Sequence, residues 1–474
     1  MVSITTYFKG HLMKILPPEP HVDLYNEGFG DVDLLERKKV GKALSDLIDR
    51  IDDPLVIALH GQWGTGKTHF LKRWVGAHTI ENGSAATKVY FDAFAHDYLN
   101  DPLPALVSAL TERLPDNKQD KVQKVKAAAF KLAKPIARIG LALATFGATE
   151  ALSDVGDAVV EAVSDEGAAS LEKYWKEETG RREAMLEFKN AMGALATPAT
   201  EGDVGSSLVF VIDELDRCRP DYALEVLEVI KHFFSVPHVH FILGVNLNAL
   251  ENSVEARYGG NTNGHAYLKK FIQITLELPD EIGDHYNNRS ANLVYLQHLI
   301  EEMGVPAHVA KPLKSQVALV SRFNHVSMRD IGKIVSSISL ASNDVLTSSN
   351  ILIGWISVMI DLVILKNVRP DLYPKFLNAT VNDDDFASYI GATTKTLARE
   401  IEGDHNPEYS SEIFLHYITW LYIVHDGHLK NEYSEYNQGI GQKFDRWGGL
   451  DEARKVPMKI HSKWLEQFSF YKNE

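Results

Sequence analysis

The chain has 474 residues, of which 45% are hydrophobic and 24% charged, so it can bury a large core and is long enough for more than one domain. It contains 49 Lys and Arg residues against 64 Asp and Glu residues, and the formal net charge of -15 disfavours indiscriminate binding to nucleic acid or anionic membranes. The single cysteine, Cys218, excludes an intrachain disulfide and a thiolate cluster for structural zinc, as is typical of a protein in a reducing cytoplasm.

The most apolar stretches of the chain are too short to cross a membrane. Residues 139–149 and residues 351–365 both fall below the roughly 20 residues that a bilayer requires, and the second stretch contains Asp361. Residues 1–10 lack the basic start and the sustained apolar core of a signal peptide. We therefore expect a cytoplasmic protein without a membrane span.

The first part of the chain predicts a helix, a strand, a glycine-rich loop and a second helix. Residues 1–30 are expected to be irregular because prolines interrupt them, whereas residues 34–51 carry apolar side chains at helical spacing. Residues 55–59 form an unbroken apolar run of strand length, and an amphipathic helix is expected over residues 69–77, after the loop.

Strands and helices continue to alternate after this loop. Apolar runs predict three further strands, at residues 88–93, 207–213 and 239–245. Apolar side chains at helical spacing predict two helices, at residues 102–114 and 221–234. Near-continuous apolar strands that alternate with helices are typical of a parallel sheet covered on both faces. The sequence therefore predicts an α/β fold with three layers.

The predicted domains follow from these patterns. Residues 31–117 and 198–280 form the α/β core, and residues 118–197, rich in alanine and charge, predict a helical insertion. Residues 281–474 predict a C-terminal all-helical domain, after an N-terminal irregular segment of residues 1–30.

The glycine-rich loop has the G-x-x-x-x-G-K-[ST] spacing of a phosphate-binding loop, or P-loop, and it lies between a strand and a helix as that motif requires. Its residues are Gly61, Gln62, Trp63, Gly64, Thr65, Gly66, Lys67 and Thr68. The glycines let backbone N–H groups turn inward around phosphates, and the following helix adds the positive end of its dipole. We expect Lys67 to neutralise the β- and γ-phosphates and Thr68 to ligate Mg²⁺, and we assign His69 to the same site. The core is therefore predicted to be that of a P-loop NTPase.

Acidic residues follow the strand predicted at residues 207–213. Asp213 ends this strand, where a carboxylate beside a P-loop holds the magnesium shell. We assign Glu214 as the general base or water-positioning group, with a solvated acid at the end of a strand as the alternative. Asp216 is a weaker alternative for the same role.

Three segments together resemble KAP-family P-loop NTPases. Residues 213–220, with the sequence Asp-Glu-Leu-Asp-Arg-Cys-Arg-Pro, resemble the extended Walker B motif of that family. Residues 91–98 resemble its F-N-A-W-x-Y-D segment, and residues 267–272 with the Leu-Pro pair at 278–279 resemble the segment that closes its core. The resemblance covers residues 34–279 and implies binding of ATP, rather than GTP, together with Mg²⁺.

The chain departs from the family at two places. The family usually has aspartate after the fourth strand, where this chain has Asn246, which would hydrogen-bond the γ-phosphate or the attacking water, or cap the end of the strand. Many members carry two membrane helices between the Walker motifs, where residues 135–163 of this chain are too interrupted to span. The resemblance thus implies a soluble bacterial subgroup, in which residues 139–149 pack in a helical hairpin or against a partner or membrane.

Three arginines are candidates for contact with a γ-phosphate. Arg217 and Arg219 would act as an arginine finger, in cis or across a subunit boundary, or form salt bridges with neighbouring acids. Arg329, near the start of a predicted helix, resembles the second-sensor arginine of related ATPases. Three histidines adjoin the predicted site, and we interpret them as core or surface residues because none has the spacing of a metal site: His60, His96 and His240.

The leading functional hypothesis is an ATPase that acts as a conformational switch or motor subunit between the core and the helical domain. The resemblance implies a role in bacterial defence against phage or plasmids, in a system such as Qat, with protein partners from the same operon and an oligomeric assembly. One alternative is a nucleotide-gated assembly scaffold with little turnover. Another is a nucleic-acid-stimulated ATPase, supported only by six lysines within residues 118–134.

Overall fold

The chain is described by a computed structural model that covers residues 14–18, 21–30, 33–114, 119–132, 168–196, 207–232, 236–283, 288–348, 350–392, 411–447 and 450–466. It divides into two compact units, one formed by Pro20–Leu278 and the other by Met1–Glu19 together with Pro279–Glu474. Among the described residues, two hydrophobic cores lie in Pro20–Leu278 and a third lies in the other unit.

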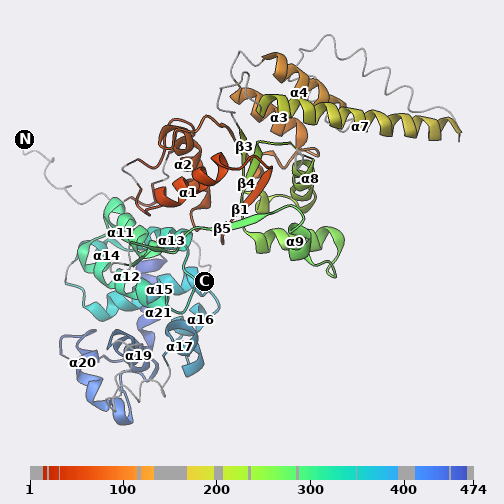
Figure 1. Cartoon of the computed structure of the whole chain (residues 1–474). Helices are drawn as coiled ribbons and strands as arrows, with labels where there is room; N and C mark the ends of the chain where they lie inside the picture. The colour runs from red at the N-terminus through yellow and green to blue at the C-terminus, as the bar shows by residue number, and fades with distance from the viewer. Residues whose placement is uncertain are drawn as a thin grey trace, which may run out of the picture. The chain divides into compact units, whose positions relative to one another are not determined.

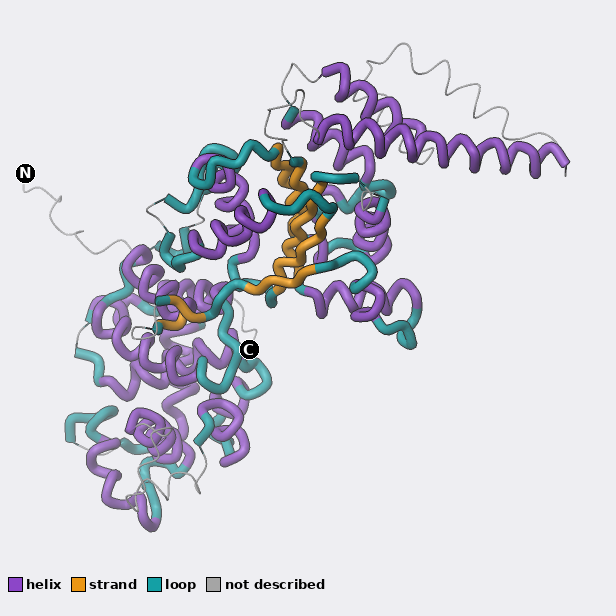
Figure 2. The backbone as a smooth tube through the Cα atoms, viewed as in Figure 1, coloured by secondary structure: helices purple, strands orange, loops and turns teal. Residues whose placement is uncertain are grey.

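A five-stranded parallel sheet forms the centre of the unit Pro20–Leu278 (Figure 2). Its strand order is β2-β3-β4-β1-β5, with every neighbouring pair parallel. The strands are β1 (Leu55–His60), β2 (Thr87–Asp92), β3 (Leu208–Asp213), β4 (Val239–Val245) and β5 (Ile274–Glu277). Burial on both faces explains why β3 and β4 are almost continuously apolar. The predicted parallel-sheet α/β core is confirmed.

Strand β5 is an element that the apolar runs did not predict. It pairs with β1 at the edge of the sheet, and only alternate residues, Ile274 and Leu276, pack against the core. Its four residues therefore alternate between apolar and polar instead of forming a continuous apolar run. So short an alternating pattern is a weak signal in a sequence.

Helices cover both faces of the sheet, which gives the three predicted layers (Figure 1). Val209 and Val211 of β3 pack with α1 and α2, whereas Phe210 and Ile212 belong to a second core with α3, α8 and α9. Successive strand residues point to opposite faces, so one strand supplies both cores. The bounds are α1 (Lys38–Asp49), α2 (Lys67–Ile80), α3 (Leu103–Arg113), α8 (Pro220–Lys231), α9 (Leu247–Tyr258) and the short α10 (Gly264–Leu268).

The described residues between β2 and β3 continue with two packed helices beyond α3. These are α4 (Gln119–Leu132) and the long α7 (Ala168–Ala196), which lie side by side in Figure 1. Lys121 donates to the carbonyl of Ala194 at 2.7 Å, and Lys131 pairs with Glu187 at 2.7 Å. Two of the six lysines noted in the sequence therefore contact α7. The predictions for residues 135–163 and 139–149 lie outside the described residues.

Among its described residues, the second unit is helical apart from loops and one two-stranded antiparallel ladder, β6 (Glu281–Ile282) with β7 (Arg289–Ser290). The predicted C-terminal helices are confirmed. In chain order the α-helices are α11 (Ala291–Met303), α12 (Ala307–Val320), α13 (Met328–Ser339), α14 (Asn343–Thr347), α15 (Ile353–Val368), α16 (Tyr373–Leu377), α17 (Asp383–Ile390), α19 (Ser411–Val424), α20 (Asn437–Gly441) and α21 (Val456–Ile460).

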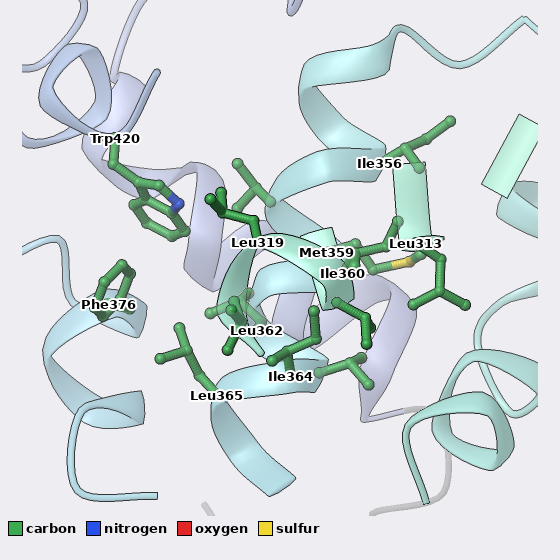
Figure 3. Close-up of a cluster of buried hydrophobic side chains, with 14 of the residues drawn as sticks. Leu313, Leu319, Ile356, Met359, Ile360, Leu362, Ile364, Leu365, Phe376 and Trp420 are labelled. Carbon is green, nitrogen blue, oxygen red and sulfur yellow. The ribbon is translucent and has the colours of Figure 1, made fainter. Parts of the chain in front are cut away.

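Helix α15 lies at the centre of the hydrophobic core of the helical unit, where Figure 3 shows its side chains among those of α12, α16 and α19. Its buried Asp361 accepts hydrogen bonds from the indole N–H of Trp420 at 2.7 Å and from the hydroxyl of Tyr389 at 3.3 Å. Burial among other helices thus accounts for the apolar sequence of residues 351–365. Over the described part of the chain, no helix combines the length and the apolar character that a membrane span requires.

Candidate functional site

The glycine-rich loop joins the end of β1 to the start of α2. Gly64 and Gly66 have φ values of 88° and 82°, in the region that residues with a Cβ rarely adopt. Gly66 lies immediately before the first helical residue, so the loop enters the helix N-terminus in this left-handed conformation. Helix N-termini present free N–H groups and a positive dipole end, and both favour anions. The loop therefore has the backbone geometry of an anion site.

Lys67 lies over this loop, at the first position of α2. Its ammonium group donates to the carbonyl oxygens of Gly61 at 2.5 Å and Gln62 at 3.0 Å, and its side chain is buried. The hydroxyl of Thr65 donates to the same Gln62 carbonyl at 3.0 Å. The positive charge of Lys67 thus lies against two carbonyl groups at the start of the loop.

Asp213, at the end of β3, is brought against the loop side of the sheet. Its carboxylate accepts hydrogen bonds from the Thr68 hydroxyl, from the Tyr90 hydroxyl at 2.8 Å and from the Glu214 N–H at 2.9 Å. Burial raises the pKa of Asp213, while these hydrogen bonds act in the opposite direction. The structure thus joins Thr68 and Asp213, the two residues predicted as metal ligands.

Glu214 has an unusual backbone for a residue with a side chain, with φ of 59°. Its carboxylate pairs with Arg217 at 3.0 Å across the short helical turn Leu215–Arg217. Burial raises the pKa of Glu214, and the charge of Arg217 opposes that rise. Left-handed backbone at such a residue stores strain and is enriched at functional sites. Of the predicted arginine alternatives, Arg217 adopts the salt bridge.

Asp216 binds the loop through a tryptophan. The indole N–H of Trp63 donates to its carboxylate at 2.6 Å, although the Trp63 side chain is half exposed. One oxygen of Asp216 is therefore engaged by the loop, as one oxygen of Glu214 is engaged by Arg217. The contact also ties the loop to the turn after β3.

Arg219 is committed to a different part of the chain. Its guanidinium donates to the backbone carbonyls of Asp97 and Leu99, and its N–H donates to the Asp97 carboxylate at 3.0 Å. Arg219 therefore hydrogen-bonds the segment that follows β2. Arg329, the second residue of α13, belongs to the other compact unit, and its role as a sensor stays a prediction.

Asn246 follows β4 and precedes α9. Its side-chain oxygen is buried and finds no hydrogen-bond partner among the described residues, and its side chain does not cap α9. Instead, Nδ1 of His60 accepts the N–H of Leu247 at 3.1 Å. The capping alternative for Asn246 is therefore not adopted, and His60 contacts the start of α9 in its place.

Of the other histidines, His69 and His96 lie toward the loop end of the sheet, whereas His240 lies opposite Leu55 at the start of β1, so the prediction that His240 adjoins the site is wrong. Burial, reinforced by Arg73 and Arg37, lowers the pKa of His69 to about 4, so this residue is neutral at pH 7. His96 hydrogen-bonds the carbonyl of Asp92 at 2.8 Å and stacks on Phe91, whereas His240 is fully buried near the start of β4. The interpretation of His96 and His240 as structural residues agrees with these positions.

Three residues of the site carry no motif signal. Tyr90 donates to Asp213, Arg37 donates to the loop carbonyls of Thr65 and Gly66, and Gly244 lies opposite Asp213 in the register of β3 and β4. A Cβ on Gly244 would come within 2.5 Å of an Asp213 oxygen, so only glycine leaves this carboxylate its place. Each role depends on strand register or on contact between distant segments, which no local pattern reveals.

The fold and the site define a P-loop NTPase. The KAP family P-loop domain matches residues 37–344, about two thirds of the chain, and the chain therefore belongs to the KAP family. None of the curated proteins compared with the sequence matches it.

Solved structures with similarity to the chain include two of the ORC2 protein of Aeropyrum pernix. The complexes with ADPNP and ADP give a TM-score of 0.36 at 13% identity, covering 85% of this chain and 87% of that one. The ADP form gives 0.34 at 12% identity, with 86% and 88% covered. The ORC1 protein of the same organism, in complex with DNA, gives 0.30 at 13% identity, with 90% and 93% covered.

Proposed function

We propose that the chain binds ATP at the loop formed by residues 61–68 and hydrolyses its β–γ phosphoanhydride bond. The observation that carries this proposal is the contact between Thr68 and Asp213, with Lys67 and Glu214 beside them in the chain. Loop N–H groups and Lys67 would hold the phosphates, and the buried carboxylate of Asp213 would ligate the metal ion.

The donor set at Thr68 and Asp213 fits Mg²⁺. A hydroxyl and a carboxylate are hard oxygen ligands, and they already touch one another. Burial raises the pKa of Asp213, and a cation beside it would offset the cost of keeping this carboxylate charged. When bound, Mg²⁺ neutralises charge on the β- and γ-phosphate oxygens.

Glu214 is the residue that we propose to orient the attacking water and take its proton. Burial raises the pKa of its carboxyl group, and a higher pKa makes a stronger base. The left-handed backbone of Glu214 turns the chain immediately after Asp213, so the strand direction is not continued at this residue. Asn246, whose side-chain oxygen has no hydrogen-bond partner within the described residues, would contact the water or the γ-phosphate from the end of β4.

Substitution of Glu214 tests the hydrolytic role. Glu214→Gln keeps the size of the side chain and removes the base, so hydrolysis should fall by about 100-fold or more while ATP binding persists. Steady-state phosphate release and ATP affinity are measured on the same preparation, with Asp221→Asn, an exposed acid on α8, as the control. Hydrolysis by Glu214→Gln at the wild-type rate, or wild-type protein that binds no ATP, would overturn the proposal.

A nucleotide-gated scaffold with slow turnover is the second candidate. The ion pair between Arg217 and Glu214, at 3.0 Å, favours it because the proposed base is held by a neighbouring cation. In that case ATP binding would organise an assembly, and hydrolysis would await a trigger. Mass measurement in solution with and without ATP decides this point, since an unchanged monomer in both conditions argues against assembly.

We also propose that ATP turnover serves a bacterial defence system, with partners encoded in the same operon. Support for this role is the family resemblance, together with a second compact unit outside the α/β core that could transmit a conformational change. The test is phage challenge of a bacterium that expresses the complete operon. Loss of protection with Lys67→Ala supports the role, and protection that Lys67→Ala leaves intact contradicts it.

A further inference from the structure

We infer that Arg37 is a positioning residue of the phosphate-binding loop. Its guanidinium hydrogen-bonds two loop carbonyls, which orients the following N–H groups toward the phosphates. This inference rests on the proposed binding of nucleotide at the loop. Arg37 stands directly before α1, 24 positions ahead of Gly61, and belongs to no recognised motif of the site.

The contacts of Arg37 are made by both ends of its guanidinium. One terminal nitrogen donates to the carbonyl oxygen of Thr65 at 2.8 Å, and the other donates to the carbonyl oxygen of Gly66 at 3.1 Å. The residue is only 4% exposed, so these bonds are shielded from water. A rigid fork that binds two consecutive carbonyls fixes both peptide groups at once.

Because the peptide bond is planar, the two hydrogen bonds of Arg37 to carbonyl groups also orient the N–H groups that follow in the loop. In a trans peptide, the carbonyl of one residue and the N–H of the next point in opposite directions. Holding the Thr65 and Gly66 oxygens toward Arg37 therefore turns the N–H groups of Gly66 and Lys67 away from it. These N–H groups lie at the N-terminus of α2, where an anion binds.

The residues around Arg37 support its contact with the loop. Asp33 accepts the N–H groups of Arg37 at 2.9 Å and Lys38 at 2.7 Å, which fixes the backbone from which the guanidinium extends. A Cβ on Gly66 would come within 2.7 Å of the guanidinium, so the approach requires glycine there in addition to its φ of 82°.

The test compares Arg37→Met and Arg37→Lys in the full chain. Binding of ADP and AMP is measured by competition with a fluorescent ADP analogue, and the melting temperature is recorded without nucleotide. The ADP-to-AMP affinity ratio reports the contribution of the β-phosphate, which the loop N–H groups hold. Arg73→Met is the matched control, because Arg73 also donates to a backbone carbonyl, that of Gly28 at 2.9 Å, outside the loop.

We expect Arg37→Met to lower the ADP-to-AMP affinity ratio by about tenfold, since two hydrogen bonds from a charged donor are lost. Arg37→Lys keeps the charge and one donor direction, so its ratio should lie between those of Arg37→Met and the wild type. Arg73→Met should keep the wild-type ratio.

A merely structural role predicts a different pattern, in which the melting temperature falls but the ratio stays at the wild-type value. That result in Arg37→Met, or in Arg37→Lys if Arg37→Met does not fold, would overturn the inference. Wild-type protein that binds neither nucleotide would instead contradict the proposed function. The two failures are therefore distinguishable.

Discussion

At the scale of single residues, close approaches between atoms set the geometry of the site. Gly244 lacks the Cβ that would clash with the Asp213 carboxylate, and Gly66 lacks the Cβ that would clash with the Arg37 guanidinium. Tyr90 keeps its proton because burial and the Asp213 charge raise its pKa, so it remains a hydrogen-bond donor to that carboxylate. The motif residues are therefore held in place by neighbours outside the motifs.

A buried histidine away from this site makes stability depend on pH. His240 is fully buried, and neither ring nitrogen has a hydrogen-bond partner within the described ranges. Burial, helped by His238 and opposed by Asp49 and Asp52, lowers its pKa to about 4. Its folded-state pKa is thus below the unfolded value of about 6.5, so the unfolded chain binds the extra proton between these values.

The free energy of unfolding should consequently fall as pH drops from about 6.5 toward 4, by about 1.4 kcal/mol per pH unit for this histidine. His240→Gln should reduce that slope by one such contribution. Urea unfolding at several pH values between 7 and 4.5 measures it. Equal slopes in the wild type and His240→Gln would show that His240 takes up no proton on unfolding.

At the scale of elements, the sequence predicts those whose side chains follow one local rule. β1, β3 and β4 are apolar runs, and the loop before α2 has a fixed motif spacing. β5 was not predicted because four alternating residues carry little pattern. Tyr90, Arg37 and Gly244 were missed for a different reason, because strand register and contacts between distant segments arise only on folding.

Helix α15 shows how a charged residue is kept inside an apolar element. Asp361 accepts from Trp420 and Tyr389, and Nε2 of His416 lies 3.2 Å from its carboxylate. Asp361→Leu would strand these buried donors, so we expect the free energy of unfolding of this unit to fall by about 3 kcal/mol. Thermal melting followed by near-ultraviolet circular dichroism measures it.

Asp384→Leu, which replaces an exposed acid on α17, serves as the control for Asp361→Leu and should change stability little. A melting curve of Asp361→Leu that coincides with that of the wild type would mean that the buried carboxylate is not required for the core around α15.

At the scale of the whole molecule, two compact units divide the chain, and the proposed hydrolytic residues Lys67, Thr68, Asp213 and Glu214 all belong to Pro20–Leu278. Arg329 belongs to the helical unit, and its role as a sensor of the nucleotide stays a prediction. In the proposed mechanism, ATP is hydrolysed in Pro20–Leu278, and the resulting conformational change involves the helical unit.

The identity of the nucleotide held by the protein after incubation with Mg²⁺ and ATP tests the central claim most directly. We predict that the wild type holds mainly ADP, that Glu214→Gln holds ATP because it binds without hydrolysing, and that Lys67→Ala holds neither. Separation of bound nucleotide by chromatography gives the answer in one assay. Equal retention of ATP by the wild type and Glu214→Gln, or retention unaffected by Lys67→Ala, would contradict the account.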